Sequence, residues 1–81
     1  MSVTQQDDMD VRLNDTDKAI LREINSNGRA TTTLLADVVD VSRTYAGDRI
    51  RRLREHGFLQ EVAPNLYDLT EKGRAEVDTN A

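Results

Sequence analysis

Apolar residues near the start of the chain recur at helical spacing. They are Ala19, Ile20, Leu21 and Ile24. Asn14 is a good N-cap for this segment, and Asp17, three residues later, can complete a capping box or face the positive end of the helix. The pair Asn27-Gly28 supplies a left-handed stop. The pattern therefore predicts a helix over about residues 15–26.

A second helix is predicted from a run of three threonines at residues 31–33, any of which can act as the cap, to about Val39. Its inward face consists of Leu35, Ala36 and Val39. Leu34 and Val38 form a further apolar pair one turn apart, which can pack under the N-terminal segment or form a subunit interface. Asp40 stands where the chain must turn, and Asp tolerates the left-handed region.

The third predicted helix covers residues 42–56, with Ser42 as its cap. Its inward stripe is Ala46, Ile50 and Leu53, which lie within about 60° of one another at 100° per residue. The residues predicted to point outward are Thr44, Tyr45, Asp48, Arg51 and Arg52. Gly57, after His56, is expected to end the helix in the left-handed conformation.

The segments FLQEV (58–62) and LYDLT (66–70) read as two short strands joined by a tight turn that contains Pro64. Thr70 and Glu71 then open a short helix. Three helices followed by a hairpin is the element order of a winged helix-turn-helix domain. The predicted fold class is thus mainly α with a small β-hairpin: a three-helix core, a two-stranded wing and a short C-terminal helix.

Length and composition fit one small domain, since the chain has 81 residues of which 37% are hydrophobic. We expect the domain to cover residues 13–78, preceded by a disordered acidic tail at 1–12 and followed by a tail at 79–81. The chain has no cysteine, no apolar run long enough to span a membrane and no signal-peptide pattern at its polar, acidic start. These features predict a cytoplasmic protein.

Positive charge is concentrated in the third helix of an acidic chain. The formal net charge is -4, yet from residue 42 to residue 53 four arginines oppose Asp48, which gives +3 there and leaves -7 on the rest. Aspartate dominates the acids and arginine the bases, because only Lys18 and Lys72 are lysines. This balance resembles that of halophilic archaeal proteins, although a GC-rich genome would also favour arginine.

Two family resemblances strengthen the fold prediction. The stretch LNDTDKAILREINSNGRATTTLLADVVDVSRTYAGDRIRRLREHGFLQEV resembles the DNA-binding half of the leucine-responsive and asparagine-regulator family. The stretch NLYDLTEKGRAEV resembles the haloarchaeal phage phi-H repressor and its multiple-antibiotic-resistance-type relatives. These resemblances imply a winged helix-turn-helix transcriptional regulator, expected to be a repressor, that binds double-stranded DNA.

The resemblance also implies which residues approach DNA, because the family inserts the start of its third helix into the major groove. The predicted DNA-binding residues are Ser42, Arg43, Thr44, Tyr45, Gly47, Asp48, Arg51 and Arg52. Arginine suits this place, since its planar fork can bind guanine or phosphate oxygens at two points. The tip of the wing carries no Lys or Arg, which puts a contact between the wing and phosphate in doubt.

Some of these residues have a structural alternative. Arg49 sits near the edge of the core and can pair with Asp37, Asp40 or Asp48 instead of touching DNA. Tyr45 can stack in the groove or pack on a neighbouring helix. Asp48 can read cytosine or orient a neighbouring arginine.

Other functions fit the residue inventory less well. With one histidine, placed at a helix end, and no cysteine, the chain offers no evident nucleophile and base, so no catalytic residues are predicted. The dispersed acids predict no metal site, and no cofactor or small-molecule effector can be inferred. We expect a homodimer that reads two half-sites. The rival reading is a winged helix that binds proteins rather than DNA.

Overall fold

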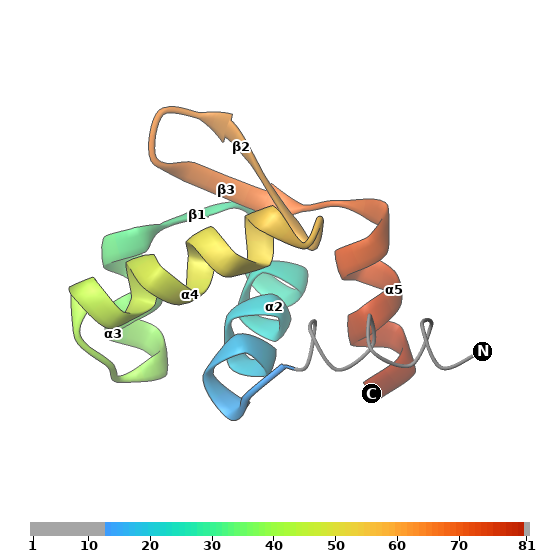
Figure 1. Cartoon of the computed structure of the whole chain (residues 1–81), viewed down its shortest axis with the longest axis horizontal. Coiled ribbons are helices and arrows are strands. Elements are labelled where there is room, and N and C mark those ends of the chain that lie inside the picture. Colours follow the sequence, from blue (N-terminus) through green and yellow to red (C-terminus); the bar gives the residue numbers. More distant parts are fainter. Residues whose placement is uncertain (1–12, 81) are drawn as a thin grey trace.

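The structure is a computed structural model that describes residues 13–80, of which residues 79 and 80 are described by their backbone only. The predicted tail at 1–12 and Ala81 lie outside these residues. The elements run in the order α2 (Asp15–Asn27), β1 (Ala30–Thr31), α3 (Thr32–Val39), α4 (Arg43–Glu55), β2 (Leu59–Ala63), β3 (Leu66–Leu69) and α5 (Glu71–Asn80) (Figure 1). Within the described part of the chain these form a mainly helical winged helix-turn-helix domain, as predicted.

Helix α2 begins and ends as its sequence predicts. The Asn14 side chain accepts a hydrogen bond from the backbone N–H of Asp17, and the Asp17 carboxylate accepts one from the backbone N–H of Asn14. This capping box satisfies two N–H groups that a helix start would otherwise leave free. Gly28 ends the helix at φ 93°, a value that favours glycine.

The link between α3 and α4 is short because both helices have local stop and start signals. Asp40 adopts the left-handed conformation with φ 62° and ψ 53°, which ends α3. Two residues later the Ser42 hydroxyl accepts a hydrogen bond from the backbone N–H of Tyr45 and caps α4. Helices α3 and α4 pack directly against each other, and Leu35 at their contact is fully buried.

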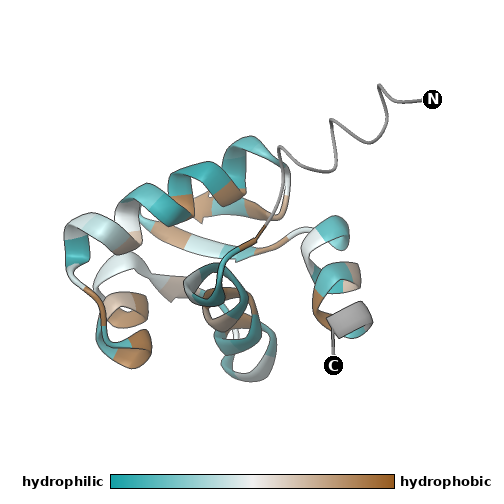
Figure 2. Ribbon diagram, turned by 60° about the horizontal axis from the view of Figure 1, so that its bottom comes forward, coloured by the Kyte–Doolittle hydropathy of each residue, from teal (hydrophilic) through white to brown (hydrophobic). Residues whose placement is uncertain are grey.

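The inward face of α4 is the predicted one, because Ala46, Ile50 and Leu53 are all buried. The helix ends at Gly57, whose φ of 84° turns the chain so that the backbone N–H of Phe58 donates to the Leu53 carbonyl. Phe58 thereby enters the same core as Leu53. This core lies between α2, α4 and the sheet, whereas the outer side of α4 is mostly hydrophilic (Figure 2).

The sheet contains a strand that the sequence analysis did not predict. Strands β2 and β3 form the expected hairpin, in which Glu61 pairs with Tyr67, and β1 joins β3 on its other edge, giving the antiparallel order β1-β3-β2. Thr32, directly after β1, donates a side-chain hydrogen bond of 3.1 Å to the Asn65 side chain in the β2–β3 turn. We call β2, β3 and this turn the wing.

Helix α5 is connected tightly to the end of α4. The Thr70 hydroxyl accepts from the backbone N–H of Gly73 and donates to the Gly57 carbonyl, so it caps α5 and also fixes it to the preceding loop. Gly73 is buried against the backbone of Phe58, and a Cβ at this position would clash with the Phe58 carbonyl oxygen. The helix extends to Asn80, two residues beyond the predicted domain end at 78.

Candidate nucleic-acid interface

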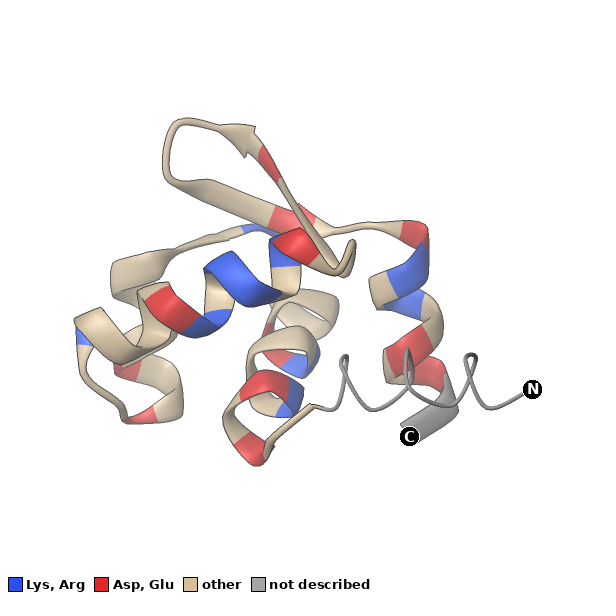
Figure 3. Ribbon diagram, in the orientation of Figure 1, with Lys and Arg blue, Asp and Glu red and all other residues tan. Residues whose placement is uncertain are grey.

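The outward face of α4 gathers the predicted DNA-binding residues. Those exposed on it are Ser42, Arg43, Thr44, Tyr45, Asp48, Arg51 and Arg52. Gly47 is half-buried. At 100° per residue, Thr44, Asp48 and Arg51 lie opposite the buried stripe, so they project furthest from the core. Figure 3 shows that the basic residues along this helix are interrupted by acidic ones.

Arg49 is turned toward α2 and partly buried, rather than exposed on this face. Its Nε and Nη2 donate to the two carboxylate oxygens of Asp17 at 2.7 and 2.6 Å, and Asp17 is completely buried. The hydrogen bonding and charge of Asp17 raise the pKa of Arg49 above its ordinary value. The prediction of a carboxylate partner for Arg49 is confirmed, but its identity was wrong, because the partner is Asp17 rather than Asp37, Asp40 or Asp48.

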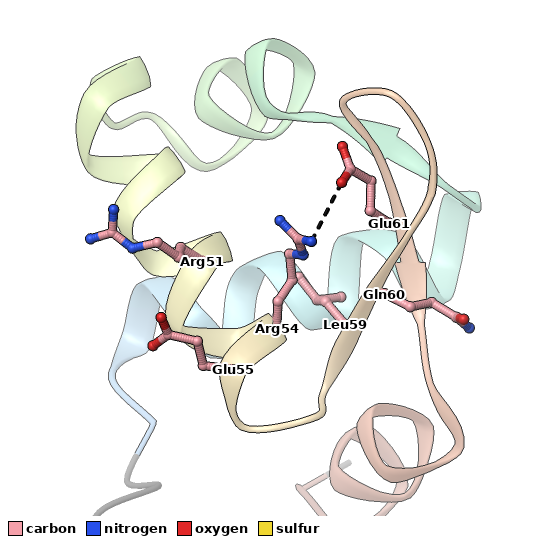
Figure 4. Close-up of a pocket in the computed structure, with 6 residues that line it drawn as sticks. All are labelled: Arg51, Arg54, Glu55, Leu59, Gln60 and Glu61. Atoms are coloured by element: carbon pink, nitrogen blue, oxygen red, sulfur yellow. Dashed lines mark ion pairs between the residues drawn. The ribbon is translucent and has the colours of Figure 1, made fainter.

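Arg54 is engaged with the wing. Its guanidinium lies 3.4 Å from the Glu61 carboxylate on β2 (Figure 4). It also lies 5.7 Å from the centre of the Tyr67 ring on β3. A cation over an aromatic ring is attracted by the ring's negative face. Arg54 thus joins the C-terminal half of α4 to the wing, as an internal contact of the domain.

The remaining three arginines of α4 are available to an external anion. Arg51 lies 3.4 Å from the Asp48 carboxylate, with both side chains more than half exposed, so water competes strongly with this pair. No carboxylate in residues 13–78 lies within ion-pair distance of Arg43 or Arg52. Helix α4 contains five arginines. Two of them, Arg49 and Arg54, make contacts within the domain, and the other three face outward.

Tyr45 and Gly47 combine exposure with internal contacts. The Tyr45 hydroxyl accepts a hydrogen bond of 3.0 Å from the Asn14 side chain, while 40% of the residue stays exposed. Tyr45 thus contacts a neighbouring helix through a hydrogen bond to the N-cap residue of α2. A Cβ at Gly47 would meet only the Thr32 methyl, at 4.0 Å, so packing within the domain does not require glycine there.

A shallow hollow of about 500 Å³ separates α4 from the wing (Figure 4). It is lined by Arg51, Arg54, Glu55, Leu59, Gln60 and Glu61. Its charges balance, and the wing itself adds Asp68, which lies 3.7 Å from Arg29, but no basic residue. The lining of the hollow therefore carries no net formal charge, and the wing is acidic.

Three contacts of α4 with other elements were not predicted from the sequence. They are Asp17–Arg49, Asn14–Tyr45 and Arg54–Glu61. Asp17 was identified only as a capping residue, and Asn14 and Arg54 were given no contact with another element. Their partners lie 32, 31 and 7 positions away along the chain. The single signal in the sequence was the position of Asp17 on the apolar side of its helix, close to Ile20, Leu21 and Ile24.

Other candidate features remain outside this face. Leu34 and Val38 are each 47% exposed on α3, next to Asp37. His56 is the C-cap of α4.

Across residues 13–80 no group of three or more His, Asp or Glu side chains is placed to hold a metal ion. None of the helices described is both long and apolar enough to cross a membrane.

The capped helix pair, the tight turn at Asp40 and the wing define a winged helix-turn-helix domain. Residues 13–60 match the family described as "Winged helix-turn-helix DNA-binding", and the chain belongs to this family. A search of the curated proteins gave no match.

Solved structures of transcriptional regulators share the fold. MarR from E. coli in its reduced form has a TM-score of 0.78 at 21% identity, covering 96% of this chain and 63% of that one. BpsR from Bordetella bronchiseptica has a TM-score of 0.77 at 20% identity, covering 84% and 52%. A probable transcriptional regulator from Pseudomonas aeruginosa has a TM-score of 0.76 at 25% identity, covering 82% and 55%. The chain spans about half the length of the first structures it matches.

Proposed function

We propose that this chain is a sequence-specific double-stranded DNA-binding transcriptional regulator that inserts α4 into the major groove. The observation that carries the proposal is the outward face of α4, where Arg43 and Arg52 form no ion pair with any carboxylate of residues 13–78 and Arg51 has only a loose, exposed one. An α-helix fits the major groove of B-DNA, and arginine is the residue that most often reads guanine there. Repression is the simplest regulatory outcome, because occupancy of a promoter site is sufficient for it.

The exposed residues have distinct roles in this arrangement. Arg43 and Thr44, in the first turn of α4, and Asp48, one turn later, read base edges. Arg51 and Arg52 contact phosphates and fix the register of the helix on the duplex. Ser42 and Gly47 allow the backbone to approach DNA closely, and Tyr45 contacts the sugar edge beside the groove.

The charge distribution limits where DNA can bind. The wing carries Glu61 and Asp68 without a basic residue, so it repels phosphates more than it attracts them. Most of the attraction therefore comes from α4, and the acidic remainder of the chain disfavours indiscriminate binding to DNA. An acidic wing is also the observation that favours the rival function, a winged helix that binds another protein.

A homodimer follows from the size of the face, because one α4 can cover only a half-site. Two copies would place their α4 helices about 34–36 Å apart, or a multiple of that distance. The exposed pair Leu34 and Val38, α2 and α5 are the surfaces that can supply the interface. Sedimentation is expected to show a dimer on DNA, and a monomer both free and on DNA would contradict the dimer.

The decisive experiment is selection of bound sequences from a random DNA pool, carried out at low salt and at molar salt. Selection at low salt detects binding that depends on phosphate contacts, which salt weakens. Selection at molar salt is included because the composition resembles that of halophilic proteins, which work at high salt. Recovery of a palindromic operator is the expected result. Recovery of no preferred sequence at either salt concentration would reject the proposed function in favour of the protein-binding alternative.

A further inference from the structure

The buried contact between α2 and α4 has the geometry of a positioning device. Asp17 is 0% exposed, and its carboxylate accepts three hydrogen bonds, two from the Arg49 fork and one from the backbone N–H of Asn14. A planar fork on a carboxylate constrains direction as well as distance. Asp17 is also fixed on its own helix, since it belongs to the capping box of α2.

A second hydrogen bond joins α4 to the start of α2, about one helical turn before the Asp17–Arg49 contact. The Asn14 side chain donates to the Tyr45 hydroxyl at 3.0 Å. Asn14 and Asp17 are three residues apart on α2, and Tyr45 and Arg49 are four apart on α4, so each pair lies on one side of its helix. Two directional contacts at successive turns oppose both rolling and sliding of α4 over α2.

The apolar core restrains the rotation of α4 less specifically than these contacts do. Ala46, Ile50 and Leu53 hold α4 against the domain, but burial of apolar surface is nondirectional. Since side-chain tips lie roughly 5 Å or more from the helix axis, a roll of 10–20° moves them by about 1–2 Å, which is enough to break a base contact. The Asp17–Arg49 pair is joined to α4 directly beside Asp48, so it acts close to the base-reading residues.

We propose that Asp17 and Arg49 are positioning residues for base reading, which hold α4 at the rotation where Thr44 and Asp48 face the bases and Arg51 faces the phosphates. This inference rests on the proposed DNA-binding function. A buried ion pair is weak evidence for stability, since an uncharged replacement often folds as well. The function of the pair is to select one orientation of α4.

The test replaces the ion pair with an uncharged pair that can still fold. In Asp17→Asn/Arg49→Gln the new amide oxygen at position 17 can still accept from the backbone of Asn14, but the charges and the fork are lost. The matched control is Arg29→Gln/Asp68→Asn, which removes an ion pair outside α4. Thermal melting and affinity for the selected operator and for random DNA are measured at one salt concentration.

We expect the double variant to melt cooperatively and to keep its affinity for random DNA. Its preference for the operator over random DNA should fall about tenfold, the discrimination that one good base contact supplies, whereas the control should keep the full preference. Should the double variant fail to fold, Arg49→Lys provides the second measurement, because it keeps the charge and loses the fork. Its preference is also expected to fall.

The two proposals fail in different ways. If the wild-type protein shows no operator preference, the proposed function itself is rejected, and the positioning role with it. If the wild type discriminates normally and a folded variant of the Asp17–Arg49 pair discriminates equally well, the function stands and the positioning role is overturned. A fall in affinity by the same factor for operator and random DNA would likewise assign the pair to the structure alone.

Discussion

The Asp48 carboxylate lies 3.4 Å from the guanidinium of Arg51, three residues later on α4, and both side chains are more than half exposed. An exposed pair of this kind contributes roughly 0–1 kcal/mol, so it does not hold either side chain firmly. Both groups are therefore free to exchange their partner for a base or a phosphate. This favours Asp48 as a base-reading residue over Asp48 as a rigid brace.

Asp48→Ala separates these two roles. We expect affinity for random DNA to rise severalfold, because a carboxylate facing phosphates is removed, and preference at one base pair to relax by about 1–3 kcal/mol. Competition against a set of single-base operator variants measures both quantities. Asp37→Ala on α3 is the control for a general loss of negative charge. A uniform fall in affinity, with no position relaxed, would support the brace.

Salt dependence distinguishes the free arginines from the structural ones. Arg52→Gln is expected to weaken binding and to reduce the slope of log affinity against log salt by about 0.9, since one phosphate contact is lost. Arg54→Gln should leave the slope unchanged, because this guanidinium is already engaged by Glu61 and Tyr67. Binding titrations at four or more salt concentrations give both slopes. Equal slopes in the two variants would show that α4 is oriented differently on DNA.

The wing can be given the phosphate contact that it lacks. Val62 is 39% exposed on β2, and Val62→Arg is expected to strengthen binding to all sequences and to steepen the salt slope by about 0.9. Val62→Gln is the matched control, since it adds a polar side chain without charge. Unchanged binding in the arginine variant would place the wing away from the duplex.

Replacing the two helical glycines, Gly47 and Gly73, by alanine should change the stability of the fold in opposite directions. Gly47→Ala is expected to stabilise the fold by up to about 1 kcal/mol, because the new Cβ has room and alanine is the better helix former. Gly73→Ala should destabilise it by about 1–3 kcal/mol, because its Cβ would clash with the Phe58 carbonyl oxygen. Chemical denaturation measures both values. Weaker DNA binding by the more stable Gly47→Ala protein would assign this glycine to the interface.

The helices were predictable from the sequence because their signals are local. Asn14, Thr31 and Ser42 cap the helices that follow them, and Asp40 and Gly57 adopt the left-handed conformations expected of them. Each of these features depends on residues within a few positions along the chain, so no knowledge of the tertiary structure is needed. The hairpin was equally accessible, because its two strands are joined by a turn.

The contacts that orient the candidate interface were not predictable in the same way. Strand β1 has two residues, too few for an alternating pattern, and it forms only by pairing with the distant β3. The Asp17–Arg49 pair likewise joins positions 32 residues apart. Arg49 belongs to the basic segment of the sequence, but its pairing with the buried Asp17 withdraws its charge from the outward face of α4.

The hydrogen bond between Thr32 and Asn65 links the first residue of α3 to the turn of the wing, and α3 packs on α4, so the wing is restrained relative to both helices. In the proposed complex, a duplex must adjust its groove width and curvature to match the spacing of α4 and the wing. The energy of this adjustment depends on the stiffness of the base steps involved. Base pairs that no side chain touches would then contribute to operator choice through the mechanics of the duplex.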